Sequence, residues 1–177
     1  MLSNDNDRFG LVSRWLHWAI AMLITALVIS GWYVVEAGYM AARYRLVLDG
    51  HQLVGLIVLV LGLGMVIWHR ISGRPEFVAT LTRAERIAAR IVHWTLYALM
   101  LGLPVTGYLA ATADGPVKLF GLTLPVLIRV DSVALEVHVY AGYVVAVVAI
   151  FHASAALKHH FVNRDQTLRR MLGGKRD

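Results

Sequence analysis

Histidine is the residue type that can do chemistry in the apolar parts of this chain. The sequence holds eight histidines and no cysteine. An ionisable or metal-ligating side chain is costly at membrane depth, so it marks a functional site. The absence of cysteine excludes iron–sulfur clusters and thiolate-ligated haem, so imidazole is the candidate ligand. Five of the histidines lie within or at the ends of long apolar segments: His17, His51, His93, His138 and His152.

Two of these histidines, His138 and His152, share the last apolar segment. In an α-helix, the interval between them is about four turns, so it returns to within about 40° of the same face and rises about 21 Å. One helix therefore presents two imidazoles to the protein interior, one in each leaflet. This spacing is typical of two haems stacked across a membrane, each iron held between neutral imidazoles from different helices.

Four apolar stretches are long enough to position the histidines. A hydrocarbon core of about 30 Å needs roughly 20 helical residues. A mean hydropathy of +0.63 with 16% charged residues excludes a soluble globular domain. No internal repeat is evident. We expect an all-α fold, an integral-membrane antiparallel four-helix bundle that forms a single domain over residues 1–177, with spans at about 15–35, 51–68, 91–111 and 133–156.

The basic residues predict the orientation of the bundle. Of the 17 Lys and Arg residues, thirteen fall in the N-terminal tail, the loop after the second span and the C-terminal tail, and they include Lys175 and Arg176. The other four lie on the opposite side. The positive-inside rule then places both termini of this multi-pass protein in the cytoplasm. The net charge of +6 is therefore a topology signal, and nucleic acid is not an expected partner.

Depth groups the histidines into two levels. His51 begins the second span, so it lies near the outer face, at the level of His138. At the inner level, His152 could pair with either His17 or His93, and helical periodicity does not separate these two alternatives. His69 is different, because it abuts Arg70 at the end of the second span, and we expect it to be an interfacial residue with no cofactor role.

Five segments resemble the prokaryotic cytochrome b561 family of di-haem membrane proteins. The likeness runs from about Arg14 to Leu172, and the last segment is the most specific because it holds both His138 and His152 and a characteristic tail. The segments are SRWLHWAIA around His17, GHQLVGLIVLV around His51, VHWTLYALMLGLPVTGY around His93, FGLTLP, and VDSVALEVHVYAGYVVAVVAIFHASAALKHHFVNRDQTLRRML.

The resemblance implies a location in the bacterial inner membrane, two b haems and a set of ligands. It implies that His17 and His152 hold the iron of the cytoplasmic-side haem, and that His51 and His138 hold the iron of the outer-side haem. His93 would then lie beside the inner haem, where it meets a propionate or orders water.

Two arginines are also implied in cofactor binding. Arg14 lies one turn before His17, and Arg90 lies one turn before His93. Both are positioned to pair with haem propionates at the cytoplasmic rim, where a guanidinium matches a carboxylate. Both also count toward the topology signal.

The resemblance implies an oxidoreductase that carries electrons between a small outer-side donor and membrane quinone, with ubiquinone as the acceptor. Superoxide oxidation coupled to quinone reduction is the activity that the family implies. A quinone needs a proton donor and a hydrogen-bond partner. His159, two helical turns after His152, and the neighbouring Lys158 are the candidates. Membrane lipid is the remaining expected partner, and the sequence does not identify a protein partner.

Two other functions stay open at this point. One is a haem b anchor subunit of a larger dehydrogenase or hydrogenase complex, which would co-purify with a second chain. The other is a proton or metal transporter that uses intramembrane histidines. A transporter would require acidic partners within the spans, and Glu136 is the plausible one.

Overall fold

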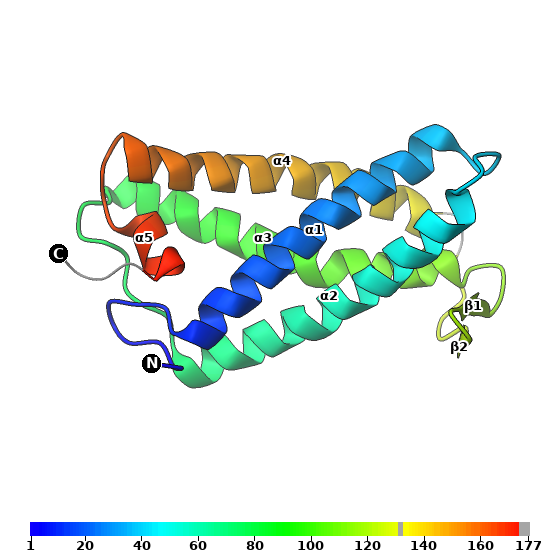
Figure 1. Ribbon diagram of the computed structural model, residues 1–177, viewed down its shortest axis with the longest axis horizontal. Helices are drawn as coiled ribbons and strands as arrows, with labels where there is room; N and C mark the ends of the chain where they lie inside the picture. Colours follow the sequence, from blue (N-terminus) through cyan, green and yellow to red (C-terminus); the bar gives the residue numbers. More distant parts are fainter. Residues whose placement is uncertain (131–132, 174–177) are drawn as a thin grey trace.

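The computed structural model describes residues 1–130 and 133–173, and Lys175 and Arg176 of the basic C-terminal tail lie outside them. Four long helices run side by side (Figure 1): α1 Leu11–Ala37, α2 Tyr44–Ser72, α3 Arg83–Ala111 and α4 Val133–Phe161. Each is long and apolar enough to cross a membrane. The expected all-α membrane bundle is confirmed. Both described ends of the chain lie at the same end of the bundle (Figure 1).

The helices extend beyond the apolar spans, and α3 shows why. It begins at Arg83, although its apolar stretch begins near residue 91. The Thr82 hydroxyl accepts a hydrogen bond from the Glu85 N–H at 3.2 Å, and the Glu85 carboxylate accepts one from the Thr82 N–H at 3.0 Å. This reciprocal capping box satisfies the free N–H groups of the first turn. Hydropathy therefore marks the membrane depth, while capping residues mark where the helix begins.

The bundle consists of two helix pairs. Helix α1 packs mainly on α2, α3 packs mainly on α4, and α2 joins the pairs through α3, whereas α1 and α4 touch less closely. Ile20, Val58 and Met100 form the buried core where α1, α2 and α3 meet. Gly62 permits this approach, because a Cβ there would lie 3.0 Å from Met100 Cε. The two pairs thus approach each other more closely along α2 and α3 than along α1 and α4.

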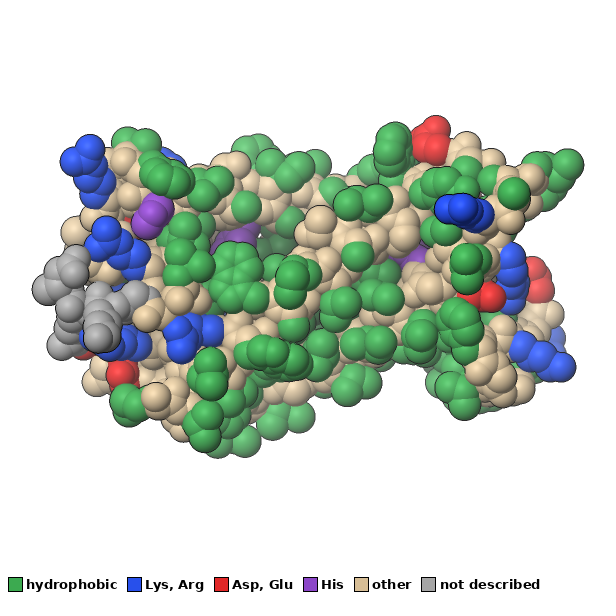
Figure 2. Space-filling model, viewed as in Figure 1, with side chains coloured by type: hydrophobic (Ala, Val, Ile, Leu, Met, Phe, Trp, Pro, Cys, Tyr) green, Lys and Arg blue, Asp and Glu red, His purple; other side chains and the backbone are tan. Residues whose placement is uncertain are grey.

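The surface matches a lipid environment. Large apolar side chains are exposed along all four long helices. Figure 2 shows them as an apolar belt across the middle of the face in view, with the charged side chains gathered toward the two ends. Histidine surface shows through this belt (Figure 2). A bundle that exposes apolar side chains and satisfies its backbone within helices is what a bilayer requires.

A β-hairpin and a short helix cover opposite ends of the bundle. Strands β1 Val117–Leu119 and β2 Leu122–Leu124 pair antiparallel, and their two-residue turn has positive φ at Phe120 and Gly121. At the other end, helix α5 Thr167–Leu172 lies against α1, where the Trp18 Nε1–H donates to the Met171 carbonyl at 3.3 Å. Helix α5 was not predicted from the sequence.

Candidate functional site

Two histidines face each other near the end of the bundle that carries the hairpin. Helices α2 and α4 both begin at this end (Figure 1), so His51 and His138, each within the first two turns of its helix, lie at the same depth. Their ring centroids are 6.0 Å apart and their planes cross at 84°. Both side chains are partly buried between the two helix pairs. We call these two residues the outer pair.

Hydrogen bonds fix the tautomers of the outer pair. His138 Nδ1 lies 3.0 Å from the Leu103 carbonyl, which can only accept, so Nδ1 carries the proton. His51 Nδ1 lies 3.0 Å from Ser30 Oγ, and that hydroxyl donates its own proton to the Leu27 carbonyl at 3.2 Å. Ser30 therefore accepts from His51. In its neutral form, each imidazole with the proton on Nδ1 keeps the Nε2 lone pair free for a metal ion.

Glycines of α1 and α3 make room for these rings. A Cβ at Gly31 would lie 3.1 Å from His51 Cε1, and a Cβ at Gly107 would lie 2.8 Å from His138 Cε1. Both distances are shorter than ordinary van der Waals contact between carbon atoms. Each imidazole thus lies directly against the backbone of a neighbouring helix, in a space that a side chain would fill.

Three histidines meet at the other level, and we call them the inner cluster. His152 of α4 lies between the other two, with ring-centroid distances of 6.2 Å to His17 on α1 and 5.2 Å to His93 on α3. The structure therefore brings together all five histidines of the apolar segments, as one pair and one triplet. His152 follows His138 by about four turns of α4, which separates the two levels by about 21 Å along the helix axis.

The two arginines expected near the inner cluster have different surroundings. Arg14 is partly buried against Gly173, the residue that follows α5, and within the described part of the chain its Nε atom is buried without a hydrogen-bond partner. Arg90 is exposed, and its guanidinium lies 5.7 Å above the Phe77 ring. A buried guanidinium nitrogen needs an acceptor. Among the described residues, the Arg14 Nε atom therefore lacks an acceptor, whereas Arg90 has an aromatic contact of its own.

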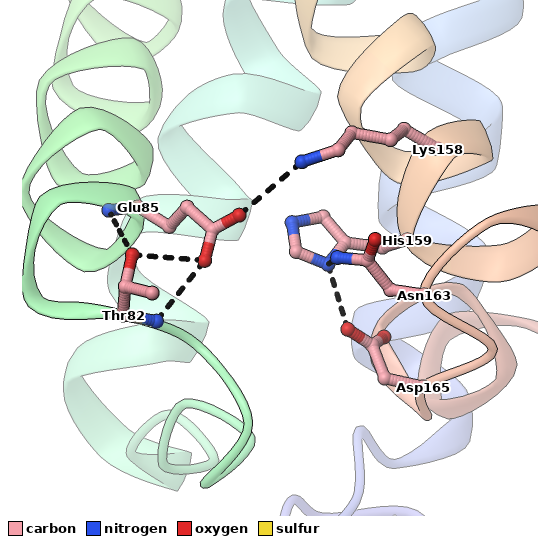
Figure 3. Close-up of polar contacts among 6 residues, drawn as sticks. All are labelled: Thr82, Glu85, Lys158, His159, Asn163 and Asp165. Carbon is pink, nitrogen blue, oxygen red and sulfur yellow. Dashed lines mark hydrogen bonds and ion pairs between the residues drawn. The ribbon is translucent and has the colours of Figure 1, made fainter.

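His159 and Lys158 do not share a partner (Figure 3). His159 is buried, and its Nδ1 lies 2.6 Å from Asp165 Oδ2 and 3.1 Å from Asn163 Nδ2. Lys158 Nζ instead extends to Glu85 Oε1 at 3.3 Å. His159 was expected from the sequence at the cytoplasmic rim, and the structure adds the carboxylate that orients its ring.

Asp165 links this histidine to helix α5. Its Oδ1 accepts from the Thr167 N–H at 2.8 Å, at the first residue of α5. Burial raises the pKa of Asp165, but hydrogen bonds from Thr167 and His159 favour the ionised form more strongly, and the net pKa lies below its ordinary value of 3.8. The ionised carboxylate therefore attaches α5 to the end of α4.

His69 has a partner that the sequence did not predict. Its Nδ1 lies 2.9 Å from the Tyr97 hydroxyl, one turn of α3 beyond His93. The guanidinium of Arg74 lies 4.8 Å above the Tyr97 ring. The expected interfacial histidine thus contacts a side chain of the neighbouring helix, close to the inner cluster.

The partners of the outer pair reveal an internal repeat that the sequence analysis did not find. Ser30-Gly31 on α1 and Thr106-Gly107 on α3 play the same part toward His51 and His138. The offset in sequence between these two dipeptides also relates Arg14 to Arg90, His17 to His93, Trp18 to Trp94 and Leu27 to Leu103. Aligning the first span with the third at this offset would have identified both hydroxyl residues.

Four membrane-spanning helices that face one another with imidazoles are the arrangement of a b-type membrane cytochrome. The chain belongs to the prokaryotic cytochrome b561 family, whose profile matches residues 8–174. Members of this family are b-type haem proteins, and the function of the chain is transmembrane electron transfer.

Individual relatives cover nearly the whole chain. "Cytochrome b561 homolog 2" of Escherichia coli (strain K12) is 34% identical over 97% of this chain and 94% of its own length. "Cytochrome b562" of Cereibacter sphaeroides is 32% identical over 89% of this chain and 90% of its own length. "Probable superoxide oxidase CybB" of Yersinia pestis is 28% identical over 97% of this chain and 99% of its own length.

The Asp165 contact predicts a pH-dependent attachment of α5. Because the pKa of Asp165 is lowered by folding, its stabilisation is complete above the ordinary value of 3.8 and is lost as the pH falls further. At pH 7, Asp165→Asn should lower the unfolding free energy by about 1–2 kcal/mol and speed amide hydrogen exchange in residues 166–172. The difference from wild type should shrink below pH 3.8.

Asp114→Asn is the matched control, because Asp114 is an exposed carboxylate at the other end of the bundle. It should leave hydrogen exchange in α5 unchanged. Equal exchange in the Asp165→Asn variant and the wild type at pH 7 would show that the carboxylate does not hold α5.

Proposed function

We propose that the chain carries electrons across the bacterial inner membrane through two b haems. His51 and His138 would hold the outer iron, and His17 and His152 would hold the inner iron. The spacing of the rings carries this proposal. Two imidazoles on opposite sides of one iron, each with an iron–nitrogen bond of about 2 Å, have ring centroids about 6 Å apart. The observed separations are 6.0 and 6.2 Å.

The same comparison supports His17 over His93 as the second inner ligand. The His93 and His152 centroids are 5.2 Å apart, about 1 Å less than such a pair needs. His93 would then lie beside the inner haem, where its imidazole can hydrogen-bond to a propionate or to a water molecule.

The surroundings of the histidines fit a flat cofactor. Gly55 and Gly142 lie one turn after His51 and His138, on the same helix faces, and a Cβ at either glycine would meet nothing within 4 Å. The α1–α4 contact is looser than the α2–α3 contact between the two helix pairs. The buried Arg14 Nε without a partner among the described residues supports Arg14 as the propionate ligand, more than Arg90, which contacts Phe77.

When bound, the two haems would supply one-electron redox chemistry. The chain would contribute placement and insulation. His51 and His138 would hold the outer group, His17 and His152 would hold the inner group, and the apolar belt excludes water from the path between the two levels. The histidines of α4 set these levels about 21 Å apart along the helix axis.

For the overall reaction, we propose that superoxide is the outer donor and ubiquinone is the acceptor. Two superoxide anions lose one electron each and become two O₂, and the two electrons with two protons convert ubiquinone to ubiquinol. The relative named as a probable superoxide oxidase supports this choice. Basic residues at the hairpin end, Arg43, Lys118 and Arg129, can attract a small anion, while Arg45 is paired with Asp49 at 3.0 Å.

We place the quinone at the opposite end, beside His159 and Lys158. Asp165 accepts the Nδ1–H of His159 at 2.6 Å, so the Nε2 atom remains available to a quinone oxygen. In Figure 3 the His159 ring turns its free edge toward the Lys158–Glu85 side. His159 follows His152 by two helical turns, about 10 Å along α4. An imidazole oriented by a carboxylate can both hydrogen-bond to a quinone and pass protons to it.

The haem count is the first test of the proposal. Purified protein in detergent should contain two b haems per chain, measured as the pyridine haemochrome against protein concentration. His138→Ala and His152→Ala should each lose one haem, with a different part of the reduced-minus-oxidised spectrum lost in each. His93→Ala should retain both, as should the control His160→Ala. A folded wild-type protein without haem would overturn the proposal, and loss of the inner haem in His93→Ala but not in His17→Ala would reassign the ligand.

The orientation in the membrane can be tested with single cysteines, because the natural chain has none. Ser3 and Thr123 are exposed at opposite ends of the bundle. In intact spheroplasts, a membrane-impermeant maleimide should label Thr123→Cys, and it should label Ser3→Cys only after permeabilisation. Both variants should label fully in permeabilised cells, which is the control. The reverse pattern would place the termini outside.

The quinone site is tested by His159→Gln, which keeps a polar side chain but removes the titratable imidazole. Reduction of the haems by a soluble ubiquinol should slow at least about 100-fold, because an imidazole that transfers protons contributes that much or more. Reduction by dithionite and the haem content should stay unchanged. His160→Gln is the matched control on the same helix. Unchanged ubiquinol kinetics in His159→Gln would locate the quinone elsewhere.

A further inference from the structure

Two hydroxyl groups at the outer pair are arranged alike on two different helices. Ser30 Oγ donates to the carbonyl of Leu27 at 3.2 Å, and Thr106 Oγ1 donates to the carbonyl of Leu103 at 3.0 Å. Each donor is thus three residues after its acceptor. The same oxygens lie 3.0 Å from His51 Nδ1 and 3.2 Å from His138 Nδ1, respectively. Each hydroxyl is therefore held by its own helix and is presented to the histidine of the next helix.

We propose that Ser30 and Thr106 are matched positioning residues that set the tautomer, the ring orientation and the basicity of the two outer haem ligands. The inference rests on the proposed function, in which His51 and His138 hold the outer iron. It adds that the internal repeat preserves a hydroxyl-glycine dipeptide at this level because both ligands need the same support.

The physical basis is the direction of the hydrogen bonds. A hydroxyl that already donates to a backbone carbonyl can only accept from the imidazole. Nδ1 must therefore carry the proton, and in the neutral ring Nε2 carries the free lone pair. The first hydrogen bond also polarises the hydroxyl and strengthens the second, especially in a medium of low dielectric constant. An imidazole that donates to a strong acceptor becomes a more basic ligand, which stabilises ferric over ferrous iron and lowers the reduction potential.

The adjacent glycine completes the support. Because Gly31 and Gly107 lack a Cβ, each ring can approach the helix closely enough for Nδ1 to reach the hydroxyl one residue away. A methyl group at Gly107 would start 2.8 Å from His138 Cε1, and the helix backbone that carries it cannot easily move away. The ring would have to tilt, and both the hydrogen bond and the direction of Nε2 would change.

Each imidazole also has a backbone group among its hydrogen-bond partners. His138 Nδ1 lies 3.0 Å from the Leu103 carbonyl, and His51 has the backbone of Leu27 as a partner. Each ring therefore keeps a backbone acceptor when its hydroxyl is removed. Loss of either hydroxyl should weaken the support of the ring without abolishing it.

The experiment is a redox titration of the purified holoprotein, followed by absorbance of the two haems. Ser30→Ala and Thr106→Ala should each raise the midpoint potential of the outer haem, and Thr106→Ser should keep the wild-type value. The inner haem is the internal control, because Ser30 lies about 20 Å beyond His17 along α1. Thr25→Ala is the matched control, since the Thr25 hydroxyl donates to the Ala21 carbonyl at 2.9 Å and contacts no histidine.

The glycines provide a second, independent measurement. Gly107→Ala should release or shift the outer haem and leave the inner haem unchanged. Gly102→Ala on the same helix should leave both haems unchanged, because Gly102 is exposed on the surface of the bundle and a Cβ there meets no protein atom within 4 Å.

The outcomes separate the two proposals. A wild-type protein without haem would overturn the proposed function itself. A protein with two haems whose midpoints in Ser30→Ala and Thr106→Ala equal those of Thr25→Ala would overturn only the positioning role. An equal shift of both haems would also overturn it, because it would mean a general change in the bundle.

Discussion

The structure depends on the need of each imidazole N–H for an acceptor inside an apolar bundle. Lipid offers none, and an unsatisfied polar group in hydrocarbon costs several kcal/mol. At the outer pair the acceptors come from a different helix in each case, α1 for His51 and α3 for His138. Pairing α1 with α2 and α3 with α4 is therefore a condition for burying the histidines. The same hydrogen bonds leave Nε2 free, so the requirement of the membrane and the requirement of the metal are met together.

The internal repeat holds at one level of the bundle and is broken at the other. At the outer level, Ser30 of α1 and Thr106 of α3 contact the histidines of α2 and α4 in the same way, so the pair is symmetric. At the inner level, α4 has His152 where α2 has Met65, each at the same interval after the outer histidine of its helix. His17 and His93 are equivalent in the repeat, and both meet this single partner. The broken symmetry explains why the inner level holds three imidazoles and why sequence periodicity could not choose between two of them.

The sequence predicted the features that depend on hydropathy and helical spacing. The four spans and the two histidine levels follow from apolar length and from the interval between His138 and His152 on α4. Helix ends were predicted less well because they depend on local capping, as at Thr82. Ser30 and Thr106 were missed because a lone hydroxyl in an apolar helix usually bonds to its own backbone, as Thr25 does. Asp165 was missed because its contact requires the chain to turn back after α4.

In the proposed function, α4 sets the distances between the two haem irons and the quinone site. His138, His152 and His159 lie on one helix at intervals of about four turns and about two turns, which keep them near one face. Their separation along the axis is then fixed by helical rise, which varies little. Other parts of the chain supply a partner to each of these histidines. Helix α1 provides the partner of His152, and α2 provides the partner of His138. The segment after α4 provides Asp165, the partner of His159. The apolar side chains of α4 can therefore change with the lipid they face, because the backbone alone maintains the spacing on which electron transfer depends.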